Sequence, residues 1–184
     1  MADIEDTSEI YSVSTETAKV NVSIRELSTI RGVVTEKEIG VRKDKDQVIM
    51  NIIQGKLSSE VEGKCGENGY TKPGSVNVMT ISSGYCRDNY ISFDVIYESM
   101  VCSPVEGMII ECTAKEITES AGIRAELDDE NDPLKIYIAR DHHIKNDVFN
   151  SIEVGDKIKV RVFGTRYELN DRYISVIVQL LSKL

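Results

Sequence analysis

The sequence predicts an α+β protein in which a small N-terminal antiparallel sheet with one main helix precedes a C-terminal β-barrel. Two patterns in the 184 residues carry this prediction. Apolar residues recur at every second position in five segments between 104 and 184, as in half-buried strands, and at about every fourth position between 49 and 61, as on one helix face. The expected domains are an acidic tail at 1–17, an N-terminal domain at 18–103 and the barrel domain at 104–184.

The N-terminal domain is expected to follow a mobile tail, because residues 1–17 are rich in serine, threonine and acids. The expected elements are strands at 18–24, around 33–35, at 75–82 and at 90–102, and a helix from a cap at Asp44 or Asp46 to Gly63. Gly55 weakens this helix by about 1 kcal/mol relative to alanine, so tertiary packing must hold it. Glycines and Pro73 make 64–74 a loop.

The barrel is predicted from five short strands in one order. They are expected at 107–117, 122–127, 134–139, 157–163 and 173–181. A glycine precedes the second strand and a longer connection separates the third from the fourth, which is the order of a five-stranded Greek-key OB barrel. Barrels of this kind commonly bind oligonucleotides. The fifth strand is so apolar that we expect both faces of its end to be covered.

Composition narrows the function classes. The N-terminus lacks the basic and apolar parts of a signal peptide, and no apolar run is long enough to span a membrane, so we expect an intracellular protein with no membrane contact. The four cysteines form no CxxC pair, which favours buried thiols over a zinc or redox site.

The net charge of −9 argues against a general nucleic-acid coat protein. The acids are concentrated, however, with five between 1 and 16 and five between 126 and 132. A local basic surface remains in the hairpin that carries Lys157, Lys159, Arg161, Arg166 and Arg172.

Catalytic chemistry has little support in the sequence, so we expect no catalytic residues, no cofactor and no metal. The acids Asp128, Asp129, Glu130 and Asp132 suit a Mg²⁺ site in type, but consecutive acids in one loop cannot all face one ion. His142 and His143 lack a cysteine or acid at ligand spacing. A solvated loop and a solvated turn are the favoured interpretations.

Several motifs in one order carry a resemblance to a known family. Ala121-Gly122-Ile123, Tyr137-Ile138-Ala139-Arg140 and Gly164-Thr165-Arg166 occur in the order of the S-one variety of RNA-binding OB domains. The run 56–63 resembles the end of the N-terminal helix of RNA polymerase stalk subunits, and the run 93–107 resembles the strand that joins their two domains. The chain is thus similar to the seventh subunit of RNA polymerase II and its archaeal and large-DNA-virus counterparts.

This resemblance implies a noncatalytic stalk subunit of a multisubunit DNA-dependent RNA polymerase, with an RNP-like tip domain before an S-one barrel. It implies partnership with the polymerase core and a fourth-subunit-like stalk protein, in the nucleus or, for a viral protein, in host cytoplasm and virion. The acidic N-terminal extension, the longer segment before the helix and the acidic loop after Leu127 indicate a divergent member. The alternative is a free-standing S-one RNA-binding factor in RNA decay or translation.

The resemblance also locates a weak site for single-stranded RNA. Arg124 and Tyr137 are outward residues of the second and third barrel strands, and a base can stack on a guanidinium plane or a tyrosine ring. Nearby cations are expected to contact phosphates. The residues expected to bind RNA are Arg124, Lys135, Tyr137, Arg140, Lys159 and Arg161.

Core docking is expected at the loop 62–70, which resembles the part of the stalk subunit that inserts into the polymerase. Its glycines let the backbone approach another chain, and Tyr70 suits an aromatic anchor. The expected docking residues are Glu62, Gly63, Lys64, Gly66, Gly69 and Tyr70. A flexible surface hairpin is the alternative.

The interface with the stalk partner is expected on the strand that joins the two domains. Apolar residues alternate along it, and an exposed apolar strand requires a cover. The expected interface residues are Val95, Tyr97, Val101 and Val105. We therefore expect poor solubility alone and a stable heterodimer with a helical partner.

Overall fold

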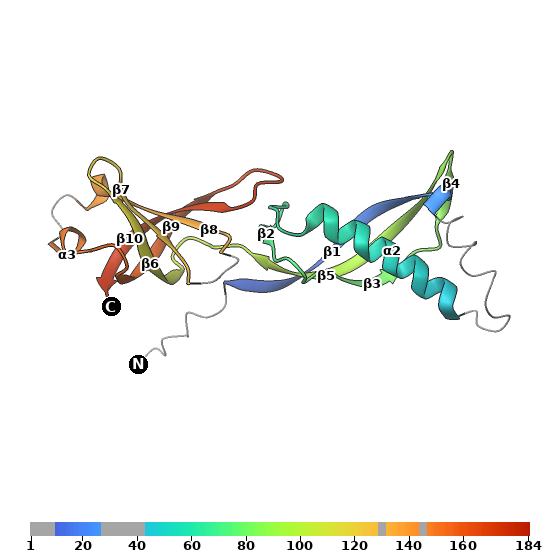
Figure 1. Ribbon diagram of the computed structural model, residues 1–184, viewed down its shortest axis with the longest axis horizontal. Coiled ribbons are helices and arrows are strands. Elements are labelled where there is room, and N and C mark those ends of the chain that lie inside the picture. Colours follow the sequence, from blue (N-terminus) through green and yellow to red (C-terminus); the bar gives the residue numbers. More distant parts are fainter. Residues whose placement is uncertain (1–9, 27–42, 129–131, 144–146) are drawn as a thin grey trace. The chain divides into compact units, whose positions relative to one another are not determined.

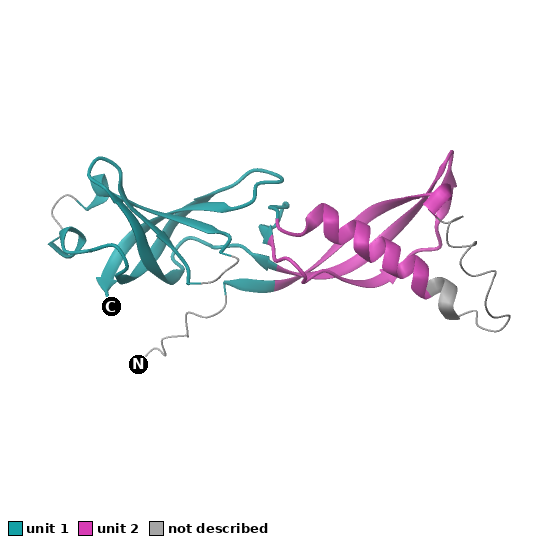
Figure 2. Ribbon diagram, in the orientation of Figure 1, with its two compact units in different colours: residues 1–12, 64–70, 101–184 teal, residues 13–63, 71–100 magenta. Residues whose placement is uncertain are grey.

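The computed structural model describes residues 10–26, 43–128, 132–143 and 147–184, without the side chains of residues 43–46. The chain divides into two compact units, which Figure 2 colours separately. Unit 1 comprises Met1–Ser12, Lys64–Tyr70 and Val101–Leu184, and unit 2 comprises Val13–Gly63 and Thr71–Met100. Whereas the expected N-terminal domain at 18–103 is continuous, the loop 64–70 is grouped with the barrel.

The N-terminal sheet is built around β5 (Tyr90–Cys102) (Figure 1). Its other strands are β1 (Tyr11–Ser23), β2 (Tyr70–Thr71), β3 (Asn77–Ile81) and β4 (Tyr85–Arg87). The strands expected at 75–82 and 90–102 are confirmed, while β2 and β4 were not predicted because two or three residues show no alternation. The strands expected around 33–35 lie outside the described residues.

The first strand starts seven residues earlier than expected. Residues 11–17 belong to β1, so the prediction of a mobile tail is wrong for them, and residues 1–9 lie outside the described part of the chain. The cause is local. Serine and threonine mask the alternation here, yet Glu16 still faces the sheet's interior side, where it accepts a hydrogen bond of 2.8 Å from the hydroxyl of Tyr97.

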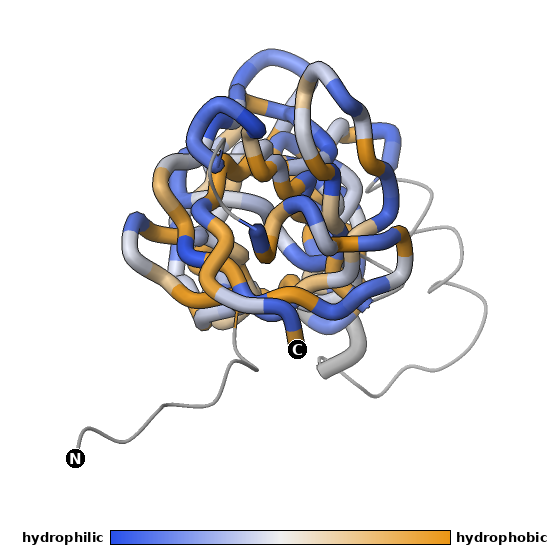
Figure 3. The backbone as a smooth tube through the Cα atoms, turned by 90° about the vertical axis from the view of Figure 1, so that its left-hand side faces the viewer, coloured by the Kyte–Doolittle hydropathy of each residue, from blue (hydrophilic) through white to orange (hydrophobic). Residues whose placement is uncertain are grey.

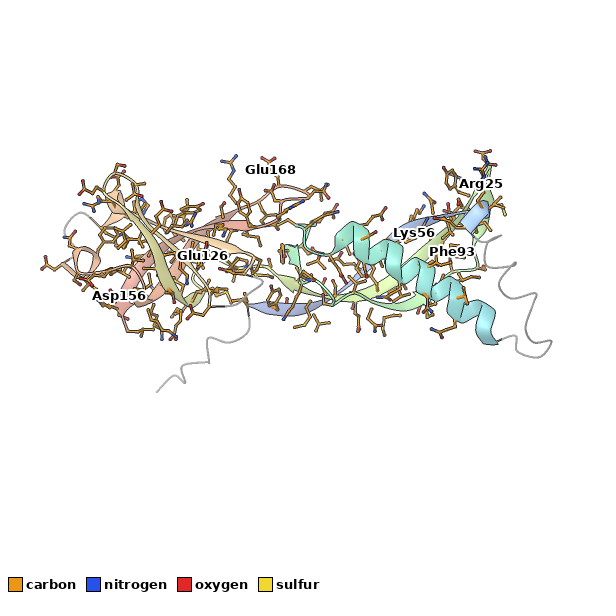
Figure 4. The ribbon with its side chains drawn as sticks, in the orientation of Figure 1. Arg25, Lys56, Phe93, Glu126, Asp156 and Glu168 are labelled. Carbon is orange, nitrogen blue, oxygen red and sulfur yellow. The ribbon has the colours of Figure 1, made fainter. Side chains whose placement is uncertain are left out.

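Helix α2 (Lys43–Val61) confirms the helix predicted from the four-residue repeat. Ile53 and Leu57 are fully buried against the apolar side of the sheet, which includes Val22 and Val95. Burying each such side chain contributes about 1.5–3 kcal/mol, which offsets the cost of Gly55. Figure 4 shows Phe93 of the same core under the helix. The expected cap at Asp44 or Asp46 is wrong, because α2 is already helical at Lys43 and both residues lie inside it.

In strand β3, the alternation of buried and exposed residues breaks after Val78. The pairing with β5 shifts between Val78 and Thr80, as at a β-bulge. Val76 and Val78 are buried, whereas Thr80 is exposed. The bulge thus turns Thr80 to the side that α2 does not cover.

The barrel in unit 1 confirms the prediction of five strands. They are β6 (Ile109–Thr118), β7 (Gly122–Glu126), β8 (Leu134–Ala139), β9 (Lys157–Arg166) and β10 (Ile174–Lys183). The closed order is β10-β8-β7-β6-β9, in which β8 and β10 are parallel and the other pairs antiparallel. Hydrophobic and hydrophilic residues alternate along the strands (Figure 3). Inward residues such as Ile136, Val160 and Val176 are fully buried and fill the barrel.

The end of β10 corrects one expectation. Leu180 is buried, but Ile177 and Leu181 are exposed, so the prediction that both faces are covered is wrong. The strand alternates between barrel interior and surface like the other four. Apolar composition alone could not distinguish a covered outer face from an exposed one.

The connection between β8 and β9 contains the 3₁₀-helix η1 (Arg140–His142) and the short helix α3 (Asp147–Asn150). His143 is buried, so the prediction of a solvated turn is wrong for it. The amide of Leu180 donates to Nε2 at 3.0 Å, which requires the proton on Nδ1, and Nδ1 donates to the carbonyl of Ala139 at 2.9 Å. The ring stacks on Phe149 with centroids 5.3 Å apart. His143 therefore fastens the connection to the barrel.

Candidate nucleic-acid interface

An open hollow of about 920 Å³ lies on the barrel's outer face. It is lined by Glu116, Thr118, Ala121, Gly122, Ile123, Arg124, Tyr137, Ile138, Ala139, Phe163, Gly164, Thr165, Arg166, Ser175 and Ile177. All five barrel strands contribute, and all of these residues belong to unit 1. We call this hollow the groove.

Three exposed apolar side chains form the floor of the groove. Tyr137 on β8 is 42% exposed, Ile177 on β10 is 45% exposed and Phe163 on β9 is 63% exposed. Ile177 pairs with both Tyr137 and Gly164, the neighbour of Phe163, so β10 brings the three strands together. Sequence reasoning found Tyr137 but missed the other two. The alternation of β9 and β10 would have placed both outward.

Gly122 positions the edge of the groove. Its φ is +120°, and a Cβ there would lie 2.1 Å from the carbonyl oxygen of Ile138. Only glycine adopts such a conformation readily, and only a residue without a side chain fits between the strands. β7 and β8 therefore approach closely, with Arg124 and Tyr137 as direct cross-strand neighbours.

The predicted cations of β7 and β8 are paired with carboxylates. Arg124 lies 3.6 Å from Glu116 through Nε and 3.7 Å from Glu126 through Nη2. Lys135 donates to Glu126 over 2.8 Å, and this hydrogen bond is the main cause that lowers the pKa of Glu126. We call Glu116, Arg124, Glu126 and Lys135 the charge ladder. Figure 4 labels Glu126 in the barrel.

The other predicted RNA contacts are more scattered. Lys159 lies 3.5 Å from Glu111, and the guanidinium of Arg140 lies 5.7 Å from the ring centre of Phe149. Arg161 is exposed on β9, two residues before Phe163. The structure thus brings Arg124 and Tyr137 into the groove, while Lys135, Arg140, Lys159 and Arg161 do not line it.

A cation that the sequence site omitted does line the groove. The side chain of Arg166 is 86% exposed and lies 4.0 Å from Glu168, whose side chain is 79% exposed. Such an exposed pair contributes little energy, so Arg166 can turn toward a ligand. The sequence placed Arg166 in a basic hairpin but did not indicate that its side chain lines the groove, because it lies at the end of β9.

The loop 64–70 is fastened to the connection between β9 and β10. The amide of Cys65 donates to the carbonyl of Asp171 at 2.7 Å, and the amide of Asn170 donates back to Cys65 at 2.8 Å. Tyr167 donates from its hydroxyl to the carbonyl of Glu67 at 3.3 Å. These partners all lie within unit 1.

Three of the expected docking residues are structural. Tyr70 is buried, so the expectation of an exposed aromatic anchor is wrong. Gly69 has a φ of +132°, and a Cβ there would lie 2.3 Å from the carbonyl oxygen of Cys102. Gly63 closes the end of α2 with a φ of +70°, and its amide donates to Thr71 at 2.9 Å. Glu62, Lys64 and Gly66 remain half-buried.

The surface expected for a stalk partner is mostly covered by the chain itself. Val95, Tyr97 and Val101 are buried, which contradicts the prediction that they are exposed. Their alternation marks a core-facing strand, a pattern that sequence alone cannot separate from an interface. Val105 is 62% exposed and remains available for contact.

The described part of the acidic loop is used within the barrel. Asp128 accepts a hydrogen bond from Thr113 at 2.8 Å and lies 3.2 Å from Lys157, while Asp132 accepts from the amides of Leu127 and Leu134 at 2.7 Å. Residues 129–131 lie outside the described residues. Among the residues that are described, no three His, Cys, Asp or Glu side chains cluster as metal ligands would.

The four cysteines have free thiols. Cys65, Cys102 and Cys112 are buried, and burial raises the pKa of Cys102 and Cys112 to about 12. Cys86 is exposed on β4. In the described segments, no helix is both long enough and apolar enough to cross a membrane.

The fold and the groove define a class: a five-strand barrel with exposed aromatic side chains on its outer surface, in one chain with a unit in which a helix packs on a sheet. No family model matches the chain. It is similar to a protein of Acanthamoeba polyphaga mimivirus that carries the provisional name of a DNA-directed RNA polymerase subunit. The two are 27% identical over 149 residues, and the match covers 71% of this chain and 71% of the viral protein.

Proposed function

We propose that the chain is a noncatalytic, stalk-type subunit of a multisubunit DNA-dependent RNA polymerase from a large DNA virus, and that its barrel binds single-stranded RNA weakly. The likeness to the mimivirus protein supports the polymerase role, because it spans most of both chains. The order of the barrel strands is that of an OB barrel, which is compatible with a stalk-type subunit. Such a protein acts in the host cytoplasm and is carried in the virion.

RNA binding rests on the floor of the groove. Tyr137 and Phe163 are exposed aromatic side chains on neighbouring parts of one surface, joined by Ile177. Each base that stacks on an aromatic ring contributes about 1–3 kcal/mol without much regard to sequence. Arg166 lines the same groove and can reach phosphate. This exposed apolar floor on a barrel is the single observation that carries the proposed RNA contact.

Core docking is proposed for the half-buried and exposed part of the loop 62–70. Gly66 is half-buried, and a Cβ there would meet only the carbonyl of Gly69, at 3.9 Å. Glu67 is exposed beside it. The stalk partner is proposed to contact Val105, the exposed residue of the expected set.

The barrel and its groove alone would also suit a free-standing RNA-binding factor, since neither requires a polymerase. Affinity purification from producing cells separates the two functions. A subunit elutes with the large polymerase subunits in equal amounts, and a free factor elutes without them.

A further inference from the structure

The charge ladder crosses the strands at the side of the groove. Its members alternate in sign from Glu116 on β6 through Arg124 and Glu126 on β7 to Lys135 on β8. The separations are 3.6, 3.7 and 2.8 Å. Glu116 and Arg124 both line the groove. Two cations that would suit phosphate are thus balanced by two carboxylates.

We propose that Glu116 and Glu126 set the RNA affinity of the barrel by neutralising the charges of Arg124 and Lys135 beside the groove. This inference rests on the proposed RNA binding. An RNA strand that reaches Arg124 meets the carboxylate of Glu116 on the same groove wall, so phosphate is repelled where the cation would attract it. Stacking on Tyr137 and Phe163 then supplies most of the affinity, and binding is weak with a shallow salt dependence.

The salt dependence separates this role from a purely structural one. Single-stranded nucleic acids lose affinity with a slope of about −0.7 per phosphate neutralised in a plot of log affinity against log salt. Replacing Glu116 and Glu126 with glutamine removes both negative charges while keeping side-chain size and an acceptor for Lys135. Arg124 and Lys135 then become available to phosphate.

The test compares wild type, Glu116→Gln, Glu126→Gln and the double variant in fluorescence anisotropy. The probe is a fluorescein-labelled, mixed-sequence, single-stranded RNA of about twelve nucleotides, within the length that a barrel of this kind covers. We expect the double variant to bind about three- to tenfold more tightly at low salt and to show a slope steeper by about 0.7 for each released cation. Glu98→Gln on β5 in unit 2 is the matched control for each single variant, because it removes one negative charge outside the barrel.

An unchanged affinity and slope in the double variant, with wild-type binding that still depends on Tyr137 and Phe163, contradicts this inference alone. A gain that Glu98→Gln reproduces contradicts it as well, because the effect is then one of net charge. No binding by either wild type or double variant overturns it together with the proposed RNA contact. Urea unfolding of each variant checks that the barrel remains folded.

Discussion

Tyr137 and Phe163 are outward residues of the barrel for which we propose a joint role. They stand on β8 and β9, which do not pair with each other, and β10 lies between them. Exposed aromatic rings cost solubility, so two of them around Ile177 on one face are better explained by a ligand than by packing. Stacking is the interaction that such rings offer to single-stranded RNA.

We expect Tyr137→Ala and Phe163→Ala each to weaken RNA binding. The loss of one stacked base corresponds to about 1–3 kcal/mol, or roughly a fivefold to hundredfold weaker affinity. Anisotropy titration at fixed salt measures the change. Tyr90→Ala removes an exposed aromatic ring of unit 2 and serves as the control. Equal affinities for all four proteins would place the RNA site elsewhere.

A substitution at Gly122 tests whether the close approach of β7 and β8 at the groove requires glycine. Gly122→Ala forces a Cβ to within 2.1 Å of the Ile138 carbonyl at a φ of +120°, so β7 and β8 must separate. We expect a loss of about 2–4 kcal/mol in the free energy of unfolding. Gly164→Ala meets nothing within 4 Å and should change stability by less than about 1 kcal/mol. Similar urea midpoints for the two variants would disprove this account of Gly122.

At the scale of elements, acids tie strand ends together and give the fold a pH dependence. Hydrogen bonds from Thr113 and Lys157 lower the pKa of Asp128 from 3.8, and one from Lys183 lowers that of Asp156. In unit 2, the ammonium of Lys56 and the turn at Ser23 lower the pKa of Glu26 from 4.5 to about 2. Figure 4 labels Asp156 and Lys56. The pKa of Asp132 shifts in the opposite direction, because burial raises it.

We expect stability to fall as the pH drops from about 4.5 to about 2. A carboxylate whose pKa is lower in the folded chain stabilises it above the unfolded value, and this contribution is lost as the pH falls through the folded value. Asp132 offsets a part of the loss. Urea unfolding at a series of pH values measures the trend. Asp156→Asn, which removes one of these groups, should show a shallower decline, and a wild-type curve that stays flat would contradict the assigned ion pairs.

The elements also show what the sequence could and could not predict. Strict alternation predicted the five barrel strands, and the four-residue repeat predicted α2. Each period places its apolar residues on one face of only one regular structure, a strand or a helix. The same alternation could not say what covers Val95 and Tyr97, since a core and an interface require the same residues. Gly69 packs against the carbonyl of the distant Cys102, and Cys65, the bridge partner of Tyr70, donates to the carbonyl of Asp171. No local pattern encodes these contacts.

For the whole molecule, the loop 62–70 is either a docking surface for the polymerase or a segment that only packs against its own chain. We expect Gly66→Val to release the chain from the polymerase. The unit has room for a side chain at this position, but that side chain would clash with the polymerase in the proposed contact. The barrel should stay folded and its RNA affinity unchanged. Gly69→Val is not equivalent, since it collides with the carbonyl of Cys102 and should unfold the unit. Stoichiometric co-elution of the Gly66→Val protein with polymerase would move docking to another surface.

The polymerase role itself is tested most directly by purifying the wild-type chain from cells in which it is expressed from its native promoter. The chain carries a C-terminal affinity tag, the eluate passes through a sizing column, and each fraction is assayed for RNA synthesis from a DNA template and for protein identity by mass spectrometry. We predict that the chain, the two largest polymerase subunits and the synthetic activity peak together in equal molar amounts. Elution of the chain in fractions that hold neither those subunits nor the activity would contradict the account.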